Sequence, residues 1–159
     1  KDAGDDPDVT HGAEIVVDLE LTSKPNSIEI DGGEGVGRVT KPGIGLEIGQ
    51  AAINPTPRRM IIENLTEVGK EILEKNGIKV IISVPKGKEL GPKTDNPRIG
   101  IVNGISILGT SGIVIPYSTA SFAASIRQQL DVVLSMGDDT VVLTTGGRSE
   151  DFARKVFDL

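Results

Sequence analysis

The chain has 159 residues, of which 37 % are apolar, so it can bury a core as one ordinary domain or two small ones. It contains no cysteine and a single histidine, which excludes disulfides, thiolate metal sites and cysteine nucleophiles and argues against a protein-bound metal. Its net charge of -6 disfavours nucleic acid and anionic membranes as partners, and no apolar run is long enough to span a bilayer, so we expect a cytoplasmic globular protein.

The chain is predicted to begin with two strands and a glycine-rich stretch. Residues 13–21 are mostly apolar with acidic interruptions, as in a strand with one partly solvated face, and residues 27–30 form a second short strand. Residues 31–49 contain seven glycines, which are too many for a helix and are typical of turns, bulges and close backbone approach. We therefore expect loops and hairpins in this stretch.

A helix and a buried strand are predicted next. Thr56 is a suitable N-cap with Pro57 at the first helical position, and Asn76 with Gly77 supplies a stop. Between them, apolar residues recur at the helical spacing of three to four residues. Residues 79–84 follow at once as a strand, and the order strand, helix, strand is typical of α/β proteins.

A new unit is predicted to start after a polar loop at residues 86–97, which is rich in glycine and proline. Residues 99–102 and 105–108 have the pattern of short strands around a turn. Ser118 can cap a second helix that ends near Gly137. The apolar stripe of this helix consists of Phe122, Ile126, Leu130 and Val133.

The end of the chain is predicted to add a strand at residues 140–144, a sharp turn, and a helix that starts near Ser149. The expected fold is therefore α/β with an α+β first part: a mixed sheet segment followed by a Rossmann-like βαβα unit. We place the division between residues 1–97, the expected substrate side, and residues 98–159, the expected cofactor side.

Two glycine turns are candidate cofactor sites. In open α/β sheets, nucleotide-like ligands bind at the carboxyl ends of strands, where free backbone N–H groups and small residues allow close approach. The alternative at both places is an ordinary tight turn that uses glycine for a positive φ, and neither turn matches the P-loop pattern. The candidate cofactor-binding residues are Gly109, Thr110, Gly112, Thr144, Thr145, Gly146, Gly147 and Arg148.

Two charged clusters are further candidates. Arg58 and Arg59 lie in the predicted first turn of a helix, where they can bind the carboxylates of a substrate or pair with nearby acidic residues. Asp5, Asp6 and Asp8 lie in an acidic stretch that does not match the calcium-loop pattern. They form either a solvated turn or a catalytic cluster whose crowded carboxylates supply a general base.

Four segments occur in an order that resembles the CbiD family, the cobalt-precorrin-5B C1-methyltransferases. The segments are KDAGDDPDVTHGAEI, GGEGVGRVTKPGIGLEIGQAAINPTPRRMI, GISILGTSGIV and VVLTTGGRSE. One departure is Ile115 before Pro116, where the family has an acidic residue. Family members are longer, and both ends of this chain look cut, so we expect it to be a middle portion of such a protein.

The resemblance implies that S-adenosylmethionine donates a methyl group to C1 of cobalt-precorrin-5B and gives cobalt-precorrin-6A in anaerobic cobalamin biosynthesis. The tetrapyrrole substrate carries many carboxylates, which would explain arginines at a helix start, and an aspartate near C1 could help to balance protons. No protein-bound metal is required. Two alternatives stay open: a non-catalytic tetrapyrrole- or nucleotide-binding module, and a structural fragment whose sites are completed by other segments. A homo-oligomer is compatible with all of these interpretations.

Overall fold

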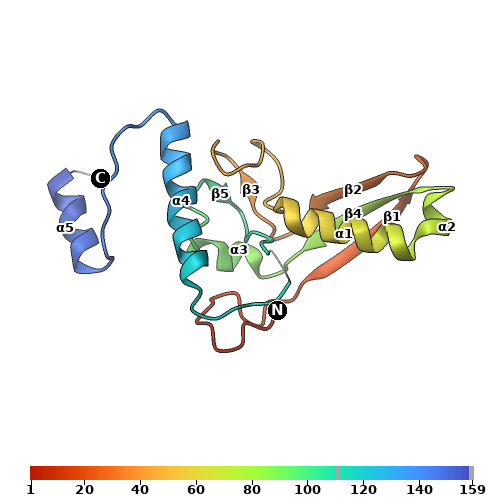
Figure 1. Ribbon diagram of the computed structural model, residues 1–159, viewed down its shortest axis with the longest axis horizontal. Coiled ribbons are helices and arrows are strands. Elements are labelled where there is room, and N and C mark those ends of the chain that lie inside the picture. Colours follow the sequence, from red (N-terminus) through yellow and green to blue (C-terminus); the bar gives the residue numbers. More distant parts are fainter. Residues whose placement is uncertain (110–111, 158–159) are drawn as a thin grey trace.

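The computed structural model describes residues 1–109 and 112–157 and shows a mixed α/β protein with a small sheet and flanking helices (Figure 1). The three-stranded sheet with α1 and α2 occupies one end of the molecule, α5 occupies the other, and α4 lies between them. The strands are β1 (Val16–Thr22), β2 (Ile28–Gly32), β3 (Arg38–Val39), β4 (Gly77–Ser83) and β5 (Ile101–Val102). The helices are α1 (Pro55–Val68), α2 (Lys70–Leu73), α3 (Gly87–Leu90), the 3₁₀ helix η1 (Gly91–Lys93), α4 (Thr119–Ser135) and α5 (Arg148–Phe157).

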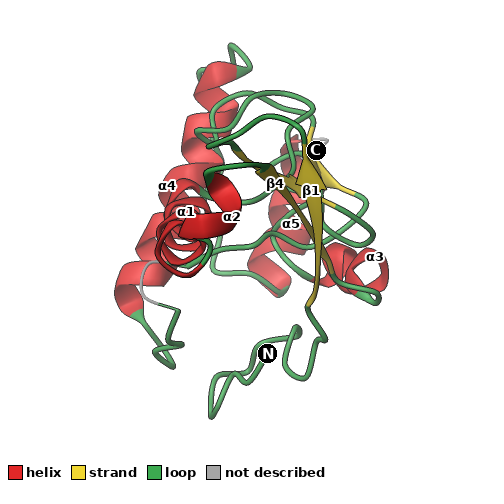
Figure 2. Ribbon diagram, turned by 90° about the vertical axis from the view of Figure 1, so that its right-hand side faces the viewer, coloured by secondary structure: helices red, strands yellow, loops and turns green. Residues whose placement is uncertain are grey.

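The larger sheet has the strand order β1-β4-β2, with β1 antiparallel and β2 parallel to the central β4. Leu19 and Ile30 both lie opposite Val80, which is buried. The α1 and α2 helices lie on one side of this sheet (Figure 2), and Ile61 and Leu65 of α1 pack against the buried row of β4. The predicted strands at the start of the chain and after the helix, and the mixed character of the sheet, are confirmed.

The α1 helix starts two residues earlier than predicted. Its N-cap is Asn54 and not Thr56, because Pro55 already supplies the fixed φ that suits the first helical position. The helix is also interrupted before the predicted stop: it ends at Val68, Gly69 breaks it, and α2 forms a further turn. Leu73 of α2 belongs to the same buried core cluster as Ile78 near the start of β4.

A second, two-stranded sheet joins residues on both sides of the predicted domain boundary at residue 97. The β3 and β5 strands pair antiparallel, and isolated bridges join Val36 to Ile105 and Ile53 to Ile107. A smaller core cluster contains Ala52, Ile99, Ile101 and Val132, with Ile44 packed against it. The division into 1–97 and 98–159 remains a prediction. The two parts contribute paired strands to one sheet and residues to one core cluster. The predicted loop at residues 86–97 is wrong in part, because it contains α3 and η1.

The α4 helix confirms its predicted bounds. The Ser118 hydroxyl accepts a hydrogen bond from the amide of Ser121 at 3.2 Å, as an N-cap does, and Gly137 follows the last turn with a φ of 91°. The predicted apolar stripe is not a buried one, because Phe122 is 69 % exposed and Val132 is the buried residue of the helix.

The expected strand at residues 140–144 does not form. The segment lies between α4 and α5, and among the described residues none of the five strands pairs with it. A strand needs a neighbour for its backbone N–H and C=O groups, so an apolar pattern alone does not produce one. The Rossmann-like βαβα unit is therefore not confirmed. The α5 helix does form, and Glu150 in its first turn lies 3.5 Å from Nη2 of Arg98 and 3.0 Å from Nη2 of Arg154.

Candidate functional site

A cavity of about 460 Å³ lies between the N-terminal segment, the segments on either side of β5, and α4. This volume is within the range of small-molecule sites, which combine apolar walls with a few polar groups. The apolar wall consists of Val9, Ile15, Ile44, Ile99, Ile101, Ile105, Ile107 and Leu108. The polar residues are Lys1, Asp8, Thr10, Asn54, Lys93, Thr94, Asp95, Asn96, Ser106, Ser125 and Gln128. We take this cavity as the candidate functional site.

One wall is held rigid by Asn96, which is buried. Its side-chain Nδ2 donates to the carbonyl oxygen of Gly104 at 2.9 Å, and its Oδ1 accepts from the hydroxyl of Ser106 at the same distance. Its backbone amide donates to the Thr94 hydroxyl at 3.2 Å, and its carbonyl oxygen accepts from the amide of Ile101 at 2.8 Å. Because three of these bonds join Asn96 to Ile101, Gly104 and Ser106, Asn96 determines where Ser106 sits in the cavity wall.

The N-terminal acidic segment forms another wall, and Asp8 is the carboxylate of this segment that lines the cavity. Asp8 accepts hydrogen bonds from the Lys1 ammonium and from the hydroxyl and the amide of Thr10, the latter two at 2.6 and 2.7 Å. Burial raises the pKa of Asp8, but these hydrogen bonds outweigh it and hold the pKa below its ordinary value. A carboxylate stabilised in this way is a weak proton acceptor, so its geometry suits orientation better than general base catalysis.

The other two predicted catalytic aspartates lie outside the cavity lining. Asp6 Oδ1 accepts from the backbone amide of Tyr117 at 3.2 Å, which ties the acidic segment to the segment that enters α4. Figure 1 shows the two segments meeting below α4. Asp5 is exposed. A catalytic role for Asp5, Asp6 and Asp8 stays a prediction, and the structure brings only Asp8 to the cavity.

The two glycine turns are not brought together. Leu108, just before Gly109, borders the cavity, and a side chain at Gly112 would contact Met60 of α1. Thr110 lies outside the described residues. The second turn consists of Thr144, Thr145, Gly146, Gly147 and Arg148 and is exposed at the start of α5, at the other end of the molecule from α1 (Figure 1). The Ser149 hydroxyl closes this turn by donating to the carbonyl oxygen of Gly146 at 2.8 Å.

The two arginines of α1 have different surroundings. Arg58 donates from Nε to the carbonyl oxygen of Ile53 at 2.9 Å and from Nη1 to that of Ile30 at 2.8 Å, so much of its guanidinium serves the fold. Arg59 is exposed on the helix surface, 3.6 Å from Glu63 one turn later. Substrate binding by either arginine stays a prediction, and Arg59 is the one whose donors face solvent.

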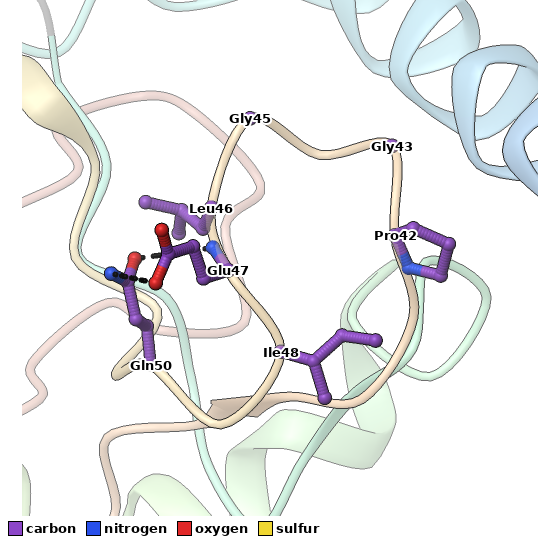
Figure 3. A pocket seen from close by; sticks show the side chains of 7 residues that line it. All are labelled: Pro42, Gly43, Gly45, Leu46, Glu47, Ile48 and Gln50. Carbon is purple, nitrogen blue, oxygen red and sulfur yellow. Dashed lines mark hydrogen bonds between the residues drawn. The ribbon is translucent and has the colours of Figure 1, made fainter.

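A second hollow, of about 680 Å³, is formed by a single loop of residues 42–50 (Figure 3). Glu47 and Gln50 bond to each other at one side of it: the Glu47 amide donates to Gln50 Oε1 at 3.2 Å, and Gln50 Nε2 donates to Glu47 Oε2 at 3.4 Å. Because one exposed loop makes the whole hollow, its shape depends on that loop alone. The cavity beside Asn96, which several separate segments of the chain build, is the stronger candidate.

Several lining residues were not foreseen from the sequence, namely Asn54, Asn96, Ser106 and Gln128. Asn96 lies in a stretch of loop-forming residues, and Asn54 precedes a proline, so each has the local pattern of a turn residue. The local sequence does not distinguish these residues from ordinary turn residues. What sets them apart is their position in the cavity wall, which depends on how distant segments pack.

No group of three or more histidine, cysteine or carboxylate side chains within residues 1–109 and 112–157 is arranged to hold a metal ion. In the same part of the chain, none of the helices combines the length and the apolar character that crossing a membrane requires.

Comparison with known proteins gives consistent matches. Residues 1–116 match the CbiD family. The chain is 57 % identical over 157 residues to a Geobacillus kaustophilus protein named cobalt-precorrin-5B C(1)-methyltransferase, covering 99 % of this chain and 42 % of that protein. It is 56 % identical over 156 residues to a protein of the same name from Rubrobacter xylanophilus, covering 98 % of this chain and 39 % of that protein.

A crystal structure of the cobalamin biosynthesis protein CbiD from Archaeoglobus fulgidus aligns with a TM-score of 0.49 and 30 % identity, covering 95 % of this chain and 46 % of that one. The chain thus spans less than half the length of these relatives.

Proposed function

The chain belongs to the CbiD family, and we propose that the protein to which it contributes transfers a methyl group from S-adenosylmethionine to C1 of cobalt-precorrin-5B, giving cobalt-precorrin-6A. The observation that carries the proposal is the identity of 53 to 57 % to proteins named cobalt-precorrin-5B C(1)-methyltransferase, which extends over nearly the whole chain. The proposed setting is the cytoplasm and cobalamin biosynthesis. A non-catalytic module that binds tetrapyrroles or nucleotides is the alternative.

We propose that the cavity beside Asn96 receives the methyl donor, and that Gly109, Thr110 and Gly112, which follow the lining residue Leu108 in the sequence, also contribute to donor binding. Apolar walls and a few fixed polar groups suit a nucleoside, and water would be excluded from the reacting atoms. S-adenosylmethionine supplies an already activated methyl group, so the protein chiefly has to align donor and acceptor carbon. Asp8 lines this cavity and would orient a bound group, and Asp5 and Asp6, which lie outside the cavity lining, are kept as the candidates for moving a proton at the substrate.

The cobalt tetrapyrrole is the proposed substrate, and its carboxylates would be bound by exposed guanidinium groups. Arg59 suits this role better than Arg58, because Arg58 already donates to two backbone carbonyls. The second glycine turn, Thr144 to Arg148, is kept as a separate candidate for the carboxylate end of the donor, with Arg148 as the anion-binding group. Nucleic acid and membrane partners are not part of the proposal, and a homo-oligomer is compatible with it.

The Rossmann-like unit also belongs to the proposal. Residues 140–144 contain Val141, Val142 and Leu143, and Leu143 is 74 % exposed, which is a costly position for an unpaired apolar segment. In proteins of the relatives' length, more than half of the chain lies outside the part matched here. A strand from that remainder could pair with residues 140–144 and complete the βαβα unit.

The test is calorimetric titration of the full-length protein and of this 159-residue chain with S-adenosylhomocysteine. Binding to both supports a donor pocket within these residues. Binding to the full-length protein alone moves the pocket to other segments and keeps the activity. Absence of binding to either, together with tetrapyrrole binding without methyl transfer, would favour the non-catalytic module.

A further inference from the structure

Asn54 is the N-cap residue of α1, but its side chain makes no capping hydrogen bond. An asparagine at this position normally accepts a hydrogen bond from the amide two or three residues later. The third position here is Pro57, which has no N–H, and the Asn54 side chain makes no capping hydrogen bond. Asn54 is also one of the residues that line the cavity beside Asn96.

The backbone of Asn54 is held on both sides. Its amide donates to the carbonyl oxygen of Ile107 at 3.0 Å, and its carbonyl oxygen accepts from the amide of Arg58 at 3.2 Å, the first bond of the helix. The Asn54 carboxamide therefore starts from a fixed point next to the apolar wall that Ile105 and Ile107 provide.

The other carboxamides of the cavity are less suited to reading a ligand. Asn96 is buried and uses both ends of its amide on Gly104 and Ser106. Gln128 has a longer side chain on α4, so fixing it would cost more conformational entropy. Asn54 alone combines a short side chain, a fixed backbone and an amide without a hydrogen-bond partner in the part of the chain described by the structure.

We propose that the Asn54 carboxamide is a specificity-determining group that recognises the adenine edge of the methyl donor, an inference that rests on the proposed function. A carboxamide presents one donor and one acceptor side by side, the pattern that pairs with N7 and the amino group of adenine. In a purine with a carbonyl oxygen in place of that amino group, this oxygen would face the Asn54 side-chain oxygen, and both atoms are acceptors. The isoleucine side chains of the wall cover the faces of the base.

The experiment compares two ligands on the full-length protein by calorimetry: S-adenosylhomocysteine and its inosine analogue, in which the amino group is replaced by a carbonyl oxygen. We expect the wild-type protein to prefer the adenine compound by about 10-fold or more. Asn54→Ser, which keeps a residue favoured at helix starts, and Asn54→Ala should bind the adenine compound about 10-fold more weakly and lose the preference.

Asn64→Ala is the matched control, because Asn64 is an exposed asparagine of the same helix whose side chain bonds the carbonyl oxygen of Met60. It should leave both affinities unchanged. A retained preference in both Asn54 variants overturns this inference alone and leaves the donor pocket in place. Failure of the wild-type protein to bind S-adenosylhomocysteine overturns the donor assignment and this inference with it.

Discussion

Nη1 of Arg58 lies 2.8 Å from the carbonyl oxygen of Ile30, so a side chain from the first turn of α1 is bonded to the backbone of β2. The same guanidinium donates through Nε to the carbonyl oxygen of Ile53. These two bonds fix the start of α1 relative to the sheet and to the segment that carries Asn54. The cavity wall at Asn54 therefore depends on a residue that does not line the cavity.

Replacing Arg58 with alanine should lower the free energy of unfolding by about 1 to 3 kcal/mol, because two backbone carbonyl oxygens lose a charged donor. Urea denaturation measures the change. Arg59→Ala is the control: its exposed pair with Glu63 is worth about 0.5 kcal/mol or less. Equal losses in the two variants would show that Arg58 does not anchor the helix.

Gly35→Ala should be among the most disruptive substitutions in the chain. Gly35 has a φ of 69°, and a Cβ atom there would overlap the carbonyl oxygen of Val84. We expect a loss of about 3 kcal/mol or more, from backbone strain and steric overlap together. Gly45→Ala is the matched control, because its φ of 75° is similar but the space around it is open.

For Gly45→Ala we expect a loss of about 1 kcal/mol, from backbone strain alone. Thermal or urea unfolding of the two variants separates overlap from strain. If Gly35→Ala lowered the free energy of unfolding no more than Gly45→Ala, the glycine-rich stretch would not lie as close to the end of β4 as described.

The Asp31 carboxylate should contribute a pH-dependent share of stability. Burial raises the pKa of Asp31, but hydrogen bonds from Arg38 at 2.7 and 3.2 Å, the amide of Gly32 and the nearby charge of Arg58 outweigh it and hold the pKa below 3.8. Because the folded state favours the carboxylate, its contribution is present above pH 3.8 and is lost as the pH falls through the lower pKa of the folded protein.

The difference in unfolding free energy between the wild-type protein and Asp31→Asn should therefore shrink from about pH 5 to about pH 3 in urea titrations. Arg38→Gln removes the main partner and should reduce the difference at the higher pH. A difference that stays constant with pH would mean that Asp31 and Arg38 do not form this pair in solution.

Gly146→Val and Gly147→Val test the second glycine turn as a donor site. If the turn binds the donor, a branched side chain at Gly146, where φ is 83°, should weaken binding of S-adenosylhomocysteine by about 10-fold or more in the full-length protein. Gly137→Val is the control, since Gly137 has a φ of 91° and open space around it but lies outside both candidate sites. Unchanged affinity in the Gly146 and Gly147 variants removes the turn from the site.

The sequence by itself determined the elements whose signals are local. Ser118 and the apolar spacing after it defined α4, because capping and periodicity act within one or two turns. The run of apolar residues in β4 predicted a strand, and the glycine-rich stretch before α1 predicted loops. Both signals are local as well. The four segments that resemble the CbiD family also lie in the sequence, and the family match over residues 1–116 confirms the family without any structure.

Tertiary structure decided what depends on partners from distant segments. Residues 140–144 have a strand pattern but no described strand beside them, so no neighbouring strand pairs with their backbone N–H and C=O groups. Asn54, Asn96 and Asp8 line one cavity because separate loops meet there, and no spacing in the sequence relates them. The sequence predicted that Arg58 lies at the start of a helix. Only the fold placed the Ile30 carbonyl oxygen within hydrogen-bonding distance of its guanidinium group. Periodicity is a property of neighbours along the chain, whereas a binding cavity is a property of neighbours in space.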